Sequence, residues 1–131
     1  TLNPEGNGLV SLYGGTCIQV AIQWSDRPNL VNRVVRACSA LVSGDGLMLK
    51  GDVRCSVEHG QVNVQHLDPG DNLRNGRYMF GDAMTRGQQS AQQLHETDHV
   101  LVVCDELLDV MRPEFETTAI ICDGRQVHAV E

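Results

Sequence analysis

The sequence is poor in aromatic residues, with two Tyr, two Phe and one Trp among 131 residues. It has no apolar run near the roughly 18 residues that a membrane-spanning helix needs, so we do not expect a membrane protein. Its five cysteines are an odd number and include no Cys-x-x-Cys pair. This pattern is typical of a reducing compartment or of an incidental set of buried thiols, so we expect no disulfide framework.

Positive charge is also scarce. Ten Lys and Arg face seventeen Asp and Glu, which gives a net charge of -7 and a pI near 5.1. General binding to a nucleic-acid backbone is therefore not expected. The chain is 41% hydrophobic and 21% charged, which is ordinary for a globular protein, and we expect one domain over residues 1–131. Because the chain opens on Thr1 rather than Met, we expect a processed product or part of something longer.

Local patterns predict several elements. Residues 17–23 alternate as a strand does, and residues 62–67 alternate up to the turn sequence Asp68-Pro69-Gly70-Asp71. Residues 117–130 read as strand, Asp123-Gly124 turn and strand, which is a hairpin signal. Residues 30–42 have a helical apolar period but are rich in Val and Leu, so either a helix or a buried strand is compatible with them.

Residues 83–99 are mostly good helix formers, and this predicted helix carries His95-Glu96-Thr97-Asp98-His99, an H-E-x-x-H sequence. On a helix, positions i and i+4 share a face, so His95 and His99 could hold one metal ion while Glu96 acts as a base toward its water. The β-branched run that begins at Val100 could instead end the helix before His99. A lone H-E-x-x-H is a moderate signal that needs support from other segments.

Four segments, in order and in spacing, resemble motifs of the peptide deformylase family. The first is Glu5-Gly6-Asn7-Gly8-Leu9-Val10-Ser11-Leu12-Tyr13, which resembles the family's G-x-G-L-A-A-x-Q, and the second is Leu30-Val31-Asn32 with Asp45-Gly46-Leu47-Met48-Leu49, which resembles V-x-N-P and E-G-C-L-S. The third is Val57-Glu58 with Val62-Asn63-Val64-Gln65-His66-Leu67-Asp68 and Asn72, which resembles V-E-R-P and V-x-V-x-x-L-D-x-x-G-N. The fourth is Gly87 with His95-Glu96-Thr97-Asp98-His99, which resembles G-L-L-A-x-x-x-Q-H-E-x-D-H. The matches cover residues 1–111, and a C-terminal hairpin in residues 112–131 lies beyond them. The resemblance implies an α+β fold with mostly antiparallel sheets around a central helix that carries H-E-x-D-H.

The resemblance also implies a site, from which this sequence departs at two positions. In the family two His and the Cys of the second motif hold the metal, the Glu moves the proton, and a Gln and a backbone amide bind the oxyanion. His95, His99 and Glu96 match, but Leu47 occupies the Cys position and has no lone pair to donate.

The implied substrate-binding residues are Gly8, Leu9, Tyr13 and Met48. Tyr13 stands at the Gln position, and loss of an oxyanion donor costs on the order of a hundredfold in rate. We expect no metal, or a weakly bound zinc or iron ion, at His95 and His99.

Two further questions stay open at this point. Cys55 or Cys38 could replace the missing thiolate, with Cys55 in the second motif if the register is shifted, although a shift would spoil the strand match that follows. The remaining histidines, His59, His66 and His128, are expected at the surface or at strand edges.

These observations predict a degenerate, catalytically inactive deformylase-like domain that is kept as a structural or binding component. The resemblance implies a translation-linked setting, for example a mitochondrial ribosome, with protein partners, in an organelle matrix or alternatively the cytoplasm. The first alternative is an active metal-dependent deformylase that removes formyl groups from nascent chains. The second is an unrelated α+β binding module.

Overall fold

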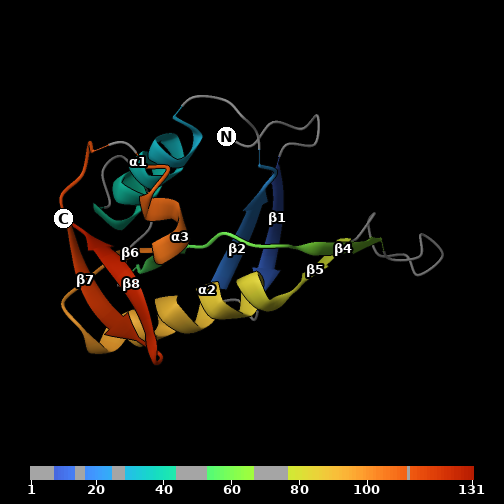
Figure 1. The fold of residues 1–131 in the computed structure, drawn as a ribbon. Coiled ribbons are helices and arrows are strands. Elements are labelled where there is room, and N and C mark those ends of the chain that lie inside the picture. Colours follow the sequence, from blue (N-terminus) through green and yellow to red (C-terminus); the bar gives the residue numbers. More distant parts are fainter. Residues whose placement is uncertain (1–7, 14–16, 25–28, 44–52, 67–76, 112) are drawn as a thin grey trace. The chain divides into compact units, whose positions relative to one another are not determined.

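The computed structural model describes most of the chain, namely residues 8–13, 17–24, 29–43, 53–66, 77–111 and 113–131. The chain divides into two compact units (Figure 1). Unit 1 contains residues 1–25 and 60–85, and unit 2 contains residues 26–59 and 86–131.

Unit 1 contains two antiparallel strand pairs. The first joins β1 (Gly8–Tyr13) to β2 (Cys17–Ile22), and the second joins β4 (Asn63–His66) to β5 (Arg77–Phe80). The strands predicted over residues 17–23 and 62–67 are therefore confirmed to within one residue at each end. The turn predicted at 68–71 lies outside the described residues.

Strand β2 presents its larger apolar side chains to solvent. Ile18 is 62% exposed and Val20 is 47% exposed, and Ile22 and Trp24 continue the same alternate row. The residues between them, Cys17, Gln19 and Ala21, are half-buried. The alternation that identifies this strand in the sequence therefore places the larger apolar residues on the more exposed side.

Gly81 links β5 to helix α2 (Asp82–Gln93) in a backbone conformation that only glycine adopts readily. Its φ is 145°, and a Cβ atom built on it would lie 2.8 Å from the carbonyl oxygen of Gln61. This carbonyl belongs to rigid backbone rather than to a movable side chain, so the turn into α2 requires a residue without Cβ.

Unit 2 is built on a four-stranded sheet with the order β3-β6-β8-β7. Its strands are β3 (Cys55–Val57), β6 (Leu101–Cys104), β7 (Thr117–Cys122) and β8 (Arg125–Val130). Strands β3 and β6 are parallel, whereas the other two neighbouring pairs are antiparallel. The α+β class is confirmed, and this sheet is mixed.

Helix α1 (Leu30–Ser43) covers one face of this sheet and resolves the uncertainty over residues 30–42 in favour of a helix. Its buried residues Val31 and Val35 pack with Leu101 and Val103 of β6, and with Leu107 of the short helix α3 (Asp105–Leu108). Figure 1 shows α1 and α3 on this side of the sheet. We call these residues, together with Cys104, the α1-side cluster.

The opposite face carries a second apolar cluster because alternate strand residues point to opposite sides. Its members are Leu94, Val102, Cys122, Val127 and Ala129. The second half of α2 lies on this side, where the Cys122 thiol donates to the carbonyl oxygen of Ser90 over 3.6 Å. We call this set the α2-side cluster.

The C-terminal hairpin predicted over residues 117–130 is confirmed. Strands β7 and β8 pair from Thr117↔Val130 to Cys122↔Arg125. Asp123 and Gly124 form the turn with φ values of 53° and 73°, the left-handed backbone of a type I′ turn. In the described part of the chain, no helix has the length and apolar character to cross a membrane.

Candidate functional site

The H-E-x-D-H sequence does not lie on a single α-helix. Helix α2 ends at Gln93, and Leu94–Glu96 form one turn of 3-10 helix. Thr97 is extended, with φ -127° and ψ 173°. The prediction of a helix over residues 83–99 is therefore wrong for its last residues.

Hydrogen bonds of the Thr97 side chain and the start of strand β6 explain why the helical segment ends here. The Thr97 hydroxyl donates to the carbonyl oxygen of Leu94 (2.9 Å) and accepts from the backbone N–H of His99 (3.1 Å). Such local bonds offer the backbone an alternative to helical pairing. Strand β6 then begins at Leu101, as the β-branched run after His99 suggested.

The three key side chains of the motif lie near the surface. His95 and Glu96 are exposed, and His99 is half-buried in an irregular segment. The shared face expected for His95 and His99 requires α-helical spacing, which this segment does not have. Neither histidine belongs to a group of three or more candidate metal ligands among the described residues.

Three of the other residues of the implied site lie in strand β1, and two lie outside the described residues. Gly8, Leu9 and Tyr13 lie in β1 of unit 1, where their backbones pair with Ile22, Ala21 and Cys17. Leu47 and Met48 lie outside the described residues.

Cys55 and Cys38 do not lie on the motif's side of the sheet. Cys55 packs against the α1-side cluster, as does Cys38, whereas Leu94, directly before His95, belongs to the α2-side cluster. Neither thiol is therefore placed as a substitute for the missing third ligand.

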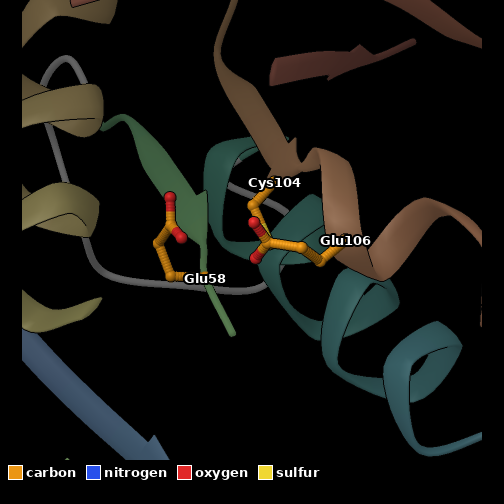
Figure 2. Close-up of side chains that lie close together, drawn as sticks. All are labelled: Glu58, Cys104 and Glu106. Atoms are coloured by element: carbon orange, nitrogen blue, oxygen red, sulfur yellow. The ribbon is translucent and has the colours of Figure 1, made fainter. Parts of the chain in front are cut away.

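A different group of side chains that could bind a metal ion lies at the ends of the parallel strands β3 and β6. Glu58 follows β3, Cys104 ends β6 and Glu106 is in α3, and one possible ligand atom from each lies within 4.8 Å of the others (Figure 2). The register Val57↔Val103 brings Glu58 beside Cys104. Sequence reasoning missed this group, and the parallel pairing of β3 with β6 is the signal that would have revealed it.

Arginines already balance the Glu58 carboxylate. Its side chain is only 7% exposed, and its Oε1 accepts a hydrogen bond from Arg125, which also donates to the Ser90 hydroxyl over 3.0 Å. Arg86 places its Nε 3.8 Å from Oε2, an oxygen that is buried without a hydrogen-bond partner. Glu58 thus joins β3 to α2 and β8 in a buried ion-pair network.

Cys104 is held as a neutral thiol. Burial raises its pKa, and the Glu58 and Glu106 carboxylates add to the rise, against hydrogen bonds with the backbone of Leu107 and His59. Cysteine acts as a nucleophile, and binds a metal ion, in its thiolate form rather than as the neutral thiol. A cation here would have to displace that proton and face two guanidinium groups, so we interpret the group as structural.

His128 differs from its prediction as a surface or strand-edge residue. It is buried in β8, and its Nε2 lies 2.7 Å from Oδ1 of the exposed Asp105 at the start of α3. His59 is exposed, as expected, and the side chain of His66 lies outside the described set.

Comparison with known proteins identifies no relative: no protein-family model, no curated protein and no solved structure matches this chain.

Proposed function

We propose that this chain is a non-catalytic domain that binds protein, as a structural component of an assembly, and that it has no deformylase activity. The observation that carries this proposal is the end of α2 at Gln93, before His95. Without a helix through residue 99, His95 and His99 lack the shared face on which a metal would be held. With no metal-bound water to activate, Glu96 has no role as a base.

The chemistry of the remaining groups also supports this proposal. The Glu58, Cys104 and Glu106 group holds a protonated thiol and a carboxylate paired with arginine, neither of which is a ready nucleophile or base. Kinship with peptide deformylases, and with it the translation-linked setting, stays a prediction from motif order and spacing.

The apolar row on β2 is the feature that favours a protein partner. Ile18, Val20, Ile22 and Trp24 expose apolar surface at alternate positions. A contiguous exposed apolar patch on a folded domain often marks a site of contact with another protein, whereas single exposed apolar residues do not.

Formate release tests the proposal. The purified chain, supplied in turn with zinc, iron or nickel, would be incubated with a formyl-Met peptide, and we expect no formate above a protein-free blank. Glu96→Gln is the matched control because it removes the carboxylate that would act as the base and changes an exposed side chain. Formate release by the wild-type chain that Glu96→Gln abolishes would overturn the proposal.

A further inference from the structure

Two of the five cysteines lie against each other. Cys38 of α1 and Cys55 of β3 are free thiols whose side chains share a hydrogen bond. Both are half-buried and pack against the α1-side cluster, which also holds α1 on the sheet. Cys104 and Cys122 are buried, whereas Cys17 lies in unit 1.

The shared hydrogen bond makes the two thiols unequal. Cys38 acts as the donor, which raises its own pKa, and burial raises that pKa further. The bond accepted by the Cys55 sulfur lowers the pKa of Cys55, against an opposing effect of burial. Cys55 is therefore the better thiolate, and Cys38 is the neighbour that can attack in a second step.

We propose that Cys38 and Cys55 are a redox-active pair that a small disulfide converts into a Cys38–Cys55 disulfide, which ties α1 to β3. The Cys55 thiolate attacks one sulfur of the small disulfide and releases one thiolate, which leaves a mixed disulfide on Cys55. The Cys38 thiol gives its proton to the released thiolate and attacks the Cys55 sulfur, which expels the second small thiolate. This thiolate takes up from solvent the proton that Cys55 gave up on ionising. The protein thus loses two electrons and two protons, and the small disulfide becomes two thiols.

The pair is suited to this reaction by its position. Because the two interacting thiols belong to one chain, the second step is intramolecular, so it outpaces capture by another small thiol. The disulfide would close the segment between α1 and β3, which restricts the unfolded chain and should raise the melting temperature of the oxidised form.

Oxidised glutathione is the probe for the test. The reduced full-length chain would be treated with it, remaining thiols would be alkylated, and the products would be mapped by mass spectrometry. We expect a Cys38–Cys55 disulfide with two glutathione molecules released, while Cys17, Cys104 and Cys122 are alkylated. Stable glutathione on Cys55 of the wild-type chain, or a disulfide that involves one of the other three cysteines, would overturn the proposal.

Single variants separate the two roles. Cys38→Ser should stop the reaction at the Cys55 mixed disulfide, and Cys55→Ser should react with glutathione disulfide about tenfold more slowly. Cys17→Ser is the matched control and should behave as the wild type. Equal rates for Cys55→Ser and the wild type would contradict the assigned roles.

One measurement uses only the wild-type chain, so its result does not depend on whether a variant folds. The reduced wild-type chain should bind phenylarsine oxide one to one, because the trivalent arsenic bridges two adjacent thiols. Absence of this binding would show that the two sulfurs are not adjacent.

Discussion

Unit 2 and unit 1 differ in where their apolar side chains lie. In unit 2 the four-stranded sheet carries a buried cluster on each face, and Val102, Val103 and Ala129 are fully buried. In unit 1 β2 exposes Ile18, Val20 and Ile22, and Trp24 just after the strand is exposed as well. The apolar strand residues thus form a core in unit 2, where β6 is buried at every position, and a surface row on β2 in unit 1.

The difference shows how far a periodic pattern can be interpreted. Alternation identifies a strand, but it does not show whether other residues of the chain pack over the apolar side of that strand and bury it. Strand β6 is covered because α1 and α3 lie on one side of it and Leu94 on the other. We infer that unit 2 supplies most of the stability and that β2 supplies a contact surface.

The largest expected contrast is between Leu94 and Ile18. Leu94 is fully buried in the α2-side cluster, so Leu94→Ala should lower the free energy of unfolding by about 3 to 4 kcal/mol. Ile18→Ala, at a side chain that is 62% exposed, should cost less than about 0.5 kcal/mol. Urea unfolding of both variants measures the contrast, and equal costs would show that the β2 row is covered in the folded chain.

A second prediction concerns the ion pairs of Glu58. Glu58→Ala leaves Arg125 partly buried without its carboxylate, so it should lower the free energy of unfolding by about 3 kcal/mol. Glu106→Ala is the matched control in the same group, and because Glu106 is exposed it should change little. A Glu58 variant as stable as the wild type would mean that the network does not hold unit 2 together.

The turn at Gly81 tests a local feature of unit 1. Gly81→Ala places a Cβ against the Gln61 carbonyl at a φ of 145°, and it should cost about 2 kcal/mol. Gly124→Ala is the control, because its φ is also positive but nothing lies within 4 Å of the added Cβ, and about 1 kcal/mol is expected. Thermal unfolding of the two variants compares them, and a smaller cost at Gly81 than at Gly124 would contradict the close contact.

The smallest predicted effect is a pH dependence of stability that arises from Glu114, between α3 and β7 of unit 2. Hydrogen bonds from Asn32 and then Arg36 of α1 lower the pKa of Glu114. Because this pKa is lower in the folded chain than in the unfolded chain, the stabilisation is present above about pH 4.5 and is lost as the pH falls further. Glu114→Gln should therefore reduce the loss of stability between pH 6 and pH 3, measured by urea midpoints, and an unchanged loss would exclude this role.

Elements that depend on local chemistry could be predicted from the sequence. The β7–β8 hairpin follows from Asp123-Gly124, which adopts the positive φ values that its turn requires. Residues 30–42 allowed two structures because Val and Leu suit both, and contact with Leu101 and Val103 favours the helix.

The end of α2 before His95 could be raised from the sequence only as an alternative, because it depends on partners beyond the helix. The Thr97 hydroxyl bonds and the pairing of β6 outweigh the helix propensity of the preceding residues. The pairs Cys38 with Cys55 and Glu58 with Cys104 were missed for a related reason, since each joins segments that only the parallel register of β3 with β6 and the packing of α1 bring together.

A calorimetric titration of Ni²⁺ into the wild-type chain and into the His95→Ala, His99→Ala double variant tests the central claim most directly. Because the two histidines lie on either side of the Thr97 turn, we predict the same weak heats for both proteins. One-to-one binding tighter than about 1 µM, about -8 kcal/mol, in the wild type alone would contradict the claim, because it would require both imidazoles to share one metal ion.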